Sequence, residues 1–429
     1  MNPAAGPAGR MNAISEQGLC IGCGICQSIA GKDRIVMAKV ASGDLRPVVV
    51  GELDDATVDH VYDVCPGTSA RGMAPERIAS DTEVDKVWGP WRRMVEAWAG
   101  DPAVRFEGST GGVLTALAQY VLRSKRVAFI LHTRTSDTDP GFGQQHYSYT
   151  EADVLAAAGS RYGPTATLVD LEDALARHEP FAFIGKPCDL TALGNQARHD
   201  PRIDTLIKYR LAMVCGGFMP PAAQDRMLEG YGIAPDRITA LRYRGRGCPG
   251  PTTITTTDRV HTLHYLDFWG EDSSQWSLPF RCKICPDGIG EQADIAASDN
   301  WPGGAPDRVE SETDPGTNIA VVRTRAGEEL LAAAVADGAL VLGREETPET
   351  LSGYQPHQVR KKYSAWPRLE GLGDEGFIRP RYEGLRLAEL AAERPESDNG
   401  AQRQGTRRRV RDGKVGEPTP RLEVDRRQS

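Results

Sequence analysis

The sequence has no long apolar run, no apolar N-terminal leader and no excess of basic charge. Stretches such as Val127–Leu131 are strand-sized, whereas a membrane span needs ~18 apolar residues. The N-terminal MNPAAGPAGRMNAISEQG lacks the apolar core of a secretory signal. Lys and Arg number 51 against 59 Asp and Glu, a net charge of −8. These absences predict a cytoplasmic protein with no membrane span and argue against a nucleic-acid partner.

What the chain does have is nine cysteines in 429 residues. Because intracellular compartments keep thiols reduced, structural disulfides are not expected in such a protein. A chain of this length is expected to form about two to three domains. The cysteines are therefore expected to bind a cofactor or to react.

Changes in composition suggest how the first part of the chain is divided. Residues 1–12 are small, polar and rich in Pro and Gly, and we expect them to be disordered. Residues 13–80 hold four cysteines and form a predicted cluster domain. Residues 81–105 contain three tryptophans and are interpreted as a linker into a larger domain.

Residues 106–345 alternate short apolar strands with helical stretches, which predicts an α/β domain. Residues 346–394 are a C-terminal extension. Residues 395–429 carry nine basic and six acidic residues among few apolar ones, so a disordered basic tail is expected. The elements with the best patterns are a helix over 113–123, strands over 127–131, 181–184 and 210–214, a hairpin over 252–265 and a helix over 328–335.

The first cysteine motif is C-x-x-C-x-x-C, formed by Cys20, Cys23 and Cys26. Its glycines allow the backbone to wrap closely around an iron–sulfur core. A 4Fe–4S cluster needs a fourth thiolate, and in ferredoxins one ligand is followed by proline, as Cys65 is here. The motif predicts a 4Fe–4S cluster; a structural zinc site is the alternative.

Five cysteines remain: Cys188, Cys215, Cys248, Cys282 and Cys285. Two of them follow predicted strands, at the ends where α/β sheets place their ligands, and two form a C-x-x-C motif. Any four of the five satisfy the count for a second cluster. We interpret Cys248 as the one left over, and ordinary buried thiols are the alternative reading for this set.

A glycine-rich loop, GSTGG at residues 108–112, opens the best helix. Its hydroxyls and free amides suit an anion, while capping of the helix by Ser109 or Thr110 is an equal alternative. Clusters transfer single electrons, so a flavin is the natural companion for two-electron chemistry on an organic substrate.

Six motifs occur in an order that resembles one family: GSTGGVLTALAQYVL, SRYGPTA, FIGKPCDLTALGN, MVCGGF, YRGRGCPGP and CKICPDGIGEQADIAASDNW. The chain resembles the coenzyme F-420 hydrogenase/dehydrogenase beta-subunit family over about residues 15–345. The RGCPGP segment leans toward the branch of 7-hydroxymethyl chlorophyll a reductase and ferredoxin-dependent divinyl chlorophyllide reductase. The surroundings of the first cluster differ from that branch, and the basic tail matches neither branch.

The resemblance implies FAD on the central domain and two 4Fe–4S clusters. The implied FAD contacts are Ser109, Thr110, Gly111, Gly112, Ser160, Arg161, Tyr162, Lys186, Pro187, Arg242, Arg244 and Gly245. The implied ligands of the flavin-proximal cluster are Cys188, Cys215, Cys282 and Cys285, which agrees with the count. The expected fold is an α/β (α+β) flavin domain, a small N-terminal ferredoxin-like cluster domain and a disordered C-terminal tail.

Three functions from different classes remain open. The first is an oxidoreductase that passes electrons from ferredoxin, or another one-electron donor, through two clusters to FAD and a small organic substrate of the chlorophyll type. The second is an electron-transfer subunit of a hydrogenase or dehydrogenase complex that reduces coenzyme F-420 or a related acceptor. The third is a zinc-stabilised binding protein. The acid–base residue and the oligomeric state are not indicated by any motif.

Overall fold

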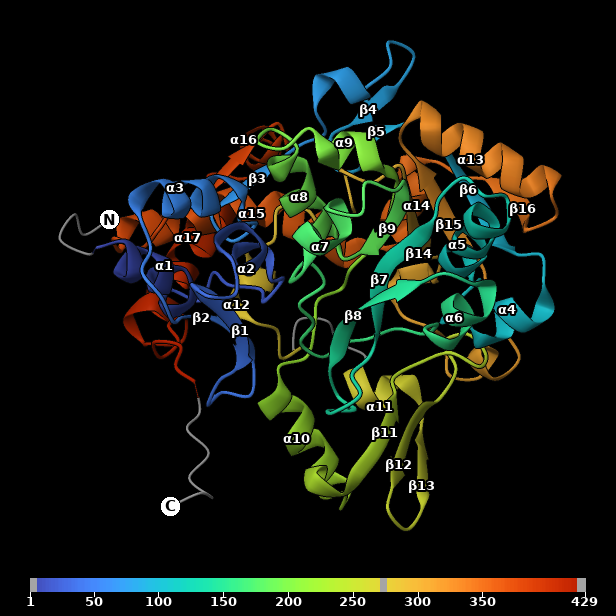
Figure 1. Cartoon of the computed structure of the whole chain (residues 1–429), viewed down its shortest axis with the longest axis horizontal. Helices are drawn as coiled ribbons and strands as arrows, with labels where there is room; N and C mark the ends of the chain where they lie inside the picture. The colour runs from blue at the N-terminus through green and yellow to red at the C-terminus, as the bar shows by residue number, and fades with distance from the viewer. Residues whose placement is uncertain (1–5, 271–275, 423–429) are drawn as a thin grey trace.

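A mixed sheet of eight strands forms the centre of the molecule, in the order β16-β6-β15-β14-β10-β9-β7-β8 (Figure 1). The computed structural model describes residues 6–270 and 276–422. Strands β7, β9, β10 and β14 run parallel, and antiparallel strands continue the sheet on both sides. This confirms the α/β class. The strands are β6 (Arg93–Ala99), β7 (Phe129–Thr135), β8 (Gly143–Ser148), β9 (Phe181–Gly185), β10 (Ile207–Met213), β14 (Ile295–Asp299), β15 (Asn318–Val322) and β16 (Leu340–Glu345).

Both faces of this sheet are buried, because side chains alternate along each strand. In β9, Phe181 and Phe183 join the core on one face, while Ala182 joins the core on the other. The second face is covered by α5 (Val113–Arg123) and α13 (Arg325–Ala336). The first is covered by elements that include α7 (Leu171–Leu175) and α8 (Pro187–Gln196).

Several predicted elements are confirmed with small shifts. The helix over 113–123 has the bounds of α5, and the strands over 181–184 and 210–214 lie within or overlap β9 and β10. The strand predicted at 127–131 begins two residues later and extends to Thr135. The predicted hairpin is formed by β12 (Thr252–Thr256) and β13 (Val260–Leu263), which join β11 (Ile238–Arg242) in a separate small sheet.

The N-terminal segment is ordered from residue 7, which corrects the expectation for residues 1–12. Residues 1–5 lie outside the described part, but Pro7–Glu16 forms helix α1. Met11 is buried, and Arg10 forms ion pairs with Asp55 and Asp59. These contacts fasten the helix to α3 despite its small, polar composition. The segment continues through α2 (Ile25–Ala30), β1 (Ile35–Lys39), β2 (Leu45–Val49), α3 (Asp55–Val64) and β3 (Ser69–Arg71).

The linker predicted over 81–105 is wrong, because β6 lies inside the central sheet between β15 and β16. Val95, Ala97 and Ala99 alternate along β6 and pack in the core, as a strand of a two-sided sheet requires. The same stretch contains the short β4 (Glu83–Asp85) and β5 (Gly89–Trp91). The tryptophans that suggested a bridge belong to this folded region.

The disordered tail predicted over 395–429 is also wrong in its first half, where Glu396–Arg411 forms helix α17. Arg403 pairs with Asp374 at 2.6 Å, and Arg407 pairs with Glu375 at 2.7 Å. Gly371 lies in the preceding long helix, α15 (Pro356–Asp374). A Cβ on Gly371 would lie 2.5 Å from the carbonyl oxygen of Arg403, so α15 and α17 touch closely at that glycine. Charge complementarity and close backbone approach hold this helix where apolar content is low. Residues 423–429 lie outside the described part.

The C-terminal extension packs against both the sheet and the N-terminal segment (Figure 1). It comprises α14 (Pro348–Tyr354), α15 (Pro356–Asp374), β17 (Arg381–Glu383) and α16 (Leu387–Ala392). Leu369 and Leu372 of α15 share a core with Cys20, Cys26 and other N-terminal residues. The remaining helices are α4 (Pro102–Glu107), α6 (Glu151–Ala156), α9 (Arg202–Leu206), α10 (Pro221–Gly230), α11 (Tyr265–Trp269) and α12 (Phe280–Lys283). No helix in the described residues is long and apolar enough to cross a membrane.

Candidate cofactor site

Three chemically useful residues lie where neighbouring strands of the central sheet end. Cys188 follows β9, Cys215 follows β10, and Asp299 ends β14. Because β9, β10 and β14 are parallel neighbours, these three positions meet at one edge of the sheet. This is the edge at which open α/β sheets bind their ligands.

The second cysteine group assembles at this edge. Cys188, Cys215, Cys282 and Cys285 all border one cavity and are half-buried. Burial raises the pKa of Cys282 to about 12, and the nearby Cys215 and Cys285 add to the shift. Burial likewise raises the pKa of Cys188, with further contributions from Asp189, Cys215 and Cys285. Thiols that repel one another's charge in this way need a bound cation or cluster to become thiolates.

The loop of Cys215 is held by α15, which belongs to the C-terminal extension. Gln358 donates from Nε2 to the carbonyl oxygen of Cys215 at 2.7 Å, and Lys361 donates from Nζ to that of Gly216 at 2.7 Å. The amide of Cys215 donates to the carbonyl oxygen of Gly288 at 2.7 Å. No sequence motif drew attention to Gln358 or Lys361, because they lie outside the stretch that carries the resemblance.

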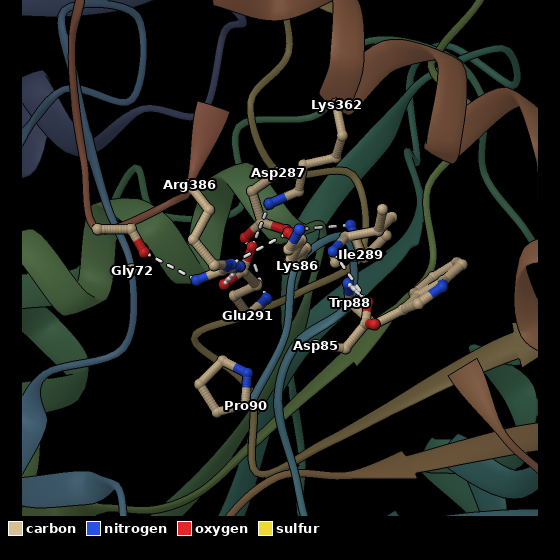
Figure 2. A network of polar contacts seen from close by, with 12 residues as sticks. Gly72, Asp85, Lys86, Trp88, Pro90, Asp287, Ile289, Glu291, Lys362 and Arg386 are labelled. Atoms are coloured by element: carbon tan, nitrogen blue, oxygen red, sulfur yellow. Dashed lines mark hydrogen bonds and ion pairs between the residues drawn. The ribbon is translucent and has the colours of Figure 1, made fainter. Parts of the chain in front are cut away.

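The loop after Cys285 is anchored by a buried polar network (Figure 2). Asp287 accepts backbone N–H groups of the turn that follows it, at 2.9 to 3.1 Å. Glu291 is fully buried and pairs with Lys362 of α15 and, at 2.5 Å, with Arg386. Burial opposes the charge of Glu291, but the two cations outweigh it and the pKa of Glu291 lies below its ordinary value. The extension therefore fixes this cysteine loop by charge as well as by packing.

The first cysteine group is buried in the N-terminal segment. Cys20, Cys23, Cys26 and Cys65 are at most 9% exposed. Gly22 and Gly67 donate their amides to the Sγ atoms of Cys20 and Cys65, each at 3.3 Å. Burial raises the pKa of Cys65 to about 11, and the nearby Cys20 adds to it.

The thiol of Cys26 is close enough to the other three for their charges to act on it. After burial, the charges of Cys23, Cys20 and Cys65 contribute most to its raised pKa. Gly24, which precedes α2, has φ +89°, and a Cβ there would lie 2.8 Å from the Cα of Val169. Glycine is therefore required at this position by its positive φ and by the close approach of Val169.

The spacing of these thiols bears on the zinc alternative. Within residues 6–270 and 276–422, no three His, Cys, Asp or Glu side chains come close enough to hold one metal ion. A four-iron cluster stays the prediction for both groups, with a zinc site as the alternative.

Cys248 lies apart from both groups. It is fully buried, and Gly316 approaches it so closely that a Cβ there would lie 3.0 Å from the Cβ of Cys248. Burial raises its pKa to about 12, and the charged groups that act on it are Arg244, Asp299 and Asp314, with no cysteine among the main causes. This placement supports its interpretation as the leftover thiol.

The cavity at the sheet edge has a volume of about 310 Å³. Besides the second cysteine group, its lining includes nine of the twelve residues predicted to contact FAD, namely Ser109, Thr110, Gly112, Ser160, Arg161, Tyr162, Lys186, Pro187 and Arg244. The other three, Gly111, Arg242 and Gly245, belong to the same loops but do not line the cavity. Gly111 packs against the backbone of Ala97 and Asn318, while Arg242 and Gly245 approach Glu107.

The hydroxyl groups of the GSTGG loop do not cap the helix. Gly112 is the N-cap of α5, with φ +73°, and no side chain caps the helix. Ser109 instead accepts the amide of Ser160 at 2.7 Å, which joins the GSTGG and SRYG loops. The alternative that Ser109 or Thr110 caps the helix is therefore wrong, and the anion-binding interpretation stays a prediction.

Arg244 connects several of the residues that line the cavity. Its guanidinium donates to Thr110 at 2.9 Å and pairs with Asp299 at 3.0 Å. The guanidinium carbon lies 5.1 Å from the ring centroid of Tyr265 and 4.7 Å from that of Trp301. Asp299 thus has a positioning contact, as a partner of Arg244.

Buried donors without acceptors test whether the cavity fits an anionic cofactor. Among the residues that line the cavity, the Nε atoms of Arg161 and Arg244 and the Nε1 atom of Trp269 are buried with no hydrogen-bond partner. Burial lowers the pKa of Arg161 to about 10, and the nearby Arg242 adds to the shift. Like charges held together and unpaired donors indicate an acceptor-rich, negatively charged ligand, and FAD fits both features.

A cavity bordered by two loops of a parallel sheet, by thiols and by arginines whose Nε atoms have no partner is typical of a protein that binds a redox cofactor. Two family models then identify the chain, both of them for the beta subunit of coenzyme F420 hydrogenase/dehydrogenase. Residues 94–172 match the model of its N-terminal part, and residues 178–347 match the model of its C-terminal part. The chain belongs to this family of oxidoreductases, which confirms the predicted family and enzyme class.

Individual relatives agree with this membership. The chain is 27% identical over 216 residues to the F420-dependent formate dehydrogenase 1 subunit beta of Methanococcus maripaludis, covering 48% of this chain and 52% of that one. The chain thus spans about half the length of that relative. It is 22% identical over 304 residues to the coenzyme F420 hydrogenase subunit beta of Methanothermobacter thermautotrophicus, covering 68% of this chain and 99% of that one.

A solved structure shares the fold. A chain of the F420-reducing [NiFe] hydrogenase complex from Methanosarcina barkeri superposes with a TM-score of 0.53 at 19% identity, over 70% of this chain and 98% of that one. These relatives bear names from the hydrogenase and dehydrogenase branch. They favour the electron-transfer subunit over the chlorophyll-type reductase, which stays a prediction.

Proposed function

We propose that the chain is an electron-transfer subunit of a hydrogenase or dehydrogenase complex, with FAD, two 4Fe–4S clusters and coenzyme F420 or a related deazaflavin as the organic acceptor. The observation that carries the proposal is the gathering of eight of nine cysteines into two groups, one of which borders the cavity lined by the GSTGG loop. The names of the relatives support the choice of acceptor.

In this proposal each set of residues holds one cofactor. Cys20, Cys23, Cys26 and Cys65 hold the first cluster inside the N-terminal segment. Cys188, Cys215, Cys282 and Cys285 hold the second beside the cavity. The arginines and hydroxyls that line the cavity would hold FAD, with the arginines suited to its phosphates. When bound, FAD supplies the exchange between one-electron and two-electron chemistry.

The partners follow from this arrangement. Clusters held by these cysteines would supply single-electron exchange with another subunit or with a ferredoxin-like donor, and FAD in the cavity would supply hydride exchange with the acceptor. A buried first cluster suits a docked protein donor better than a small molecule, since each of its thiols is at most 9% exposed.

The proposal is tested on the intact chain purified without oxygen. We expect about eight irons and one FAD per chain. The Cys215→Ala variant is expected to retain about half of the iron, and Cys248→Ala, a matched control with a buried thiol, all of it. Reduced wild-type protein is expected to reduce coenzyme F420. Colourless wild-type protein with zinc, or full iron in Cys215→Ala, would contradict the proposal.

A further inference from the structure

Arg281 connects the two cysteine groups. It precedes Cys282 on α12, and its guanidinium donates from Nε and Nη2 to the carbonyl oxygen of Pro66, the residue that follows Cys65. The Nε–O distance is 3.1 Å. The side chain is 3% exposed. One buried cation therefore touches the loop of the first group while its backbone belongs to the loop of the second.

Among the described residues, Arg281 forms no ion pair with a carboxylate. Its guanidinium carbon lies 5.7 Å from the ring centroid of Tyr382. An isolated buried cation is strongly unfavourable, so its charge needs a nearby anion. Burial opposes the charge, but Tyr382 and the thiols of Cys285, Cys188 and Cys282 outweigh it and raise the pKa of Arg281.

Two other cations near the thiols are paired with carboxylates. Lys186 pairs with Asp189 at 2.9 Å, and Arg46, which acts on Cys20, pairs with Glu417 at 2.6 Å. The charge of Arg281 is left for the thiolates on either side. Lys361 also forms no ion pair among the described residues, but its Nζ lies at the second group alone, bonded to the carbonyl oxygen of Gly216.

We propose that Arg281 sets the reduction potentials of both clusters. Its positive charge lies near each cluster and raises the reduction potential of each. The inference rests on the two clusters of the proposed function. Reduction adds one electron, and so one negative charge, to a cluster. A fixed cation in a medium of low dielectric stabilises the reduced form more than the oxidised one. Because one side chain serves both clusters, its removal affects two potentials at once.

The test is a redox titration of the loaded protein followed by electron paramagnetic resonance, which reports the midpoint potential of each cluster. In Arg281→Gln we expect both potentials to fall, with the reduction equilibrium constants lowered about tenfold, or about 59 mV for a one-electron couple. Arg281→Lys keeps the charge and is expected to stay near the wild-type values. Lys361→Met is expected to lower only the second potential.

The matched control is Arg105→Gln. Arg105 also donates from Nε to a backbone carbonyl, that of Gly316 at 2.7 Å, and contacts the ring of Trp98 at 4.9 Å. It lies beside Cys248 and not beside either cysteine group. We expect both potentials to be unchanged in this variant.

The outcomes separate this inference from the proposed function. Wild-type protein without two clusters would overturn the function itself. Two clusters with unchanged potentials in Arg281→Gln, or a shift of only one, would overturn the shared role of Arg281. If Arg281→Gln fails to hold its clusters, the Arg281→Lys variant decides. Potentials near the wild-type values support the role of charge, and reduction equilibrium constants lowered about tenfold overturn it.

Discussion

Gln358 donates a hydrogen bond from Nε2 to the carbonyl oxygen of Cys215 across 2.7 Å. The donor lies on α15, in the C-terminal extension, whereas the acceptor lies in the stretch that matches the family model over residues 178–347. The extension is thus part of the candidate site's support. The same helix contributes Lys361 and, through Lys362, the ion pair to Glu291 shown in Figure 2.

Loss of the Gln358 side chain is expected to loosen the second cysteine group. In Gln358→Leu the carbonyl of Cys215 loses its partner, at about 1–3 kcal/mol. We expect faster loss of half of the iron to a chelator, with the other half lost at the wild-type rate. Gln144→Leu, on the edge strand β8, is the control. Equal rates for Gln358→Leu and wild type would contradict this prediction.

The buried Glu291 is expected to be essential for stability. Glu291→Gln leaves Lys362 and Arg386 without their counter-ion, and such a loss typically lowers the free energy of unfolding by about 3–5 kcal/mol. Denaturant titration measures it. Glu389→Gln, at an exposed position of α16, is the control and is expected to change stability by less than about 0.5 kcal/mol. A similarly small change for Glu291→Gln would show that the network is not needed.

Acid sensitivity is expected from His132, which borders the cavity and contacts Ser148 through Nε2 at 2.8 Å. Burial, aided by the nearby His146, lowers the pKa of His132 to about 4. The unfolded chain therefore binds a proton that the folded chain does not, so stability is complete above about pH 6.5 and falls as the pH drops toward 4. The effect is at most about 3 kcal/mol.

The measurement is the free energy of unfolding of His132→Gln between pH 4 and 7. We expect a shallower fall with acid than in the wild type; the part that remains is assigned to the other groups whose pKa folding lowers, among them His357, whose pKa burial lowers to about 3, and His60 and His146. The exposed His178→Gln is the control. A wild-type slope in His132→Gln would show that His132 does not cause the acid sensitivity.

FAD affinity is expected to depend on Arg161. Its side chain borders the cavity, and its buried Nε has no partner. A charged hydrogen bond contributes about 1.5–3 kcal/mol, so Arg161→Gln is expected to raise the Kd for FAD by about 10- to 150-fold. Flavin fluorescence measures the Kd. The control is Arg246→Gln, an exposed arginine that pairs with Glu107. An unchanged Kd in Arg161→Gln would place the phosphates elsewhere.

Much of the central domain could be predicted from the sequence because its signals are local. The helix over 113–123 carries a continuous buried face, and the strands around Phe181–Ile184 and Arg210–Val214 are short apolar runs of β-forming residues. Where the local signals gave a wrong prediction, the segment is stabilised by partners distant in the sequence. Helix α17 has almost no apolar face and depends on Asp374 and Glu375, which no local pattern reveals.

By itself the sequence determined the residue types and spacings of the cysteines, the order of the family motifs and the class of the fold. Only the tertiary structure decided which thiols meet, since strand order brings Cys188 and Cys215 to one sheet edge and leaves Cys248 apart. It also decided that Arg281 lies between the two groups. Arg281 can act on both groups because it is buried and has no carboxylate partner among the described residues, and burial is a property of the folded chain.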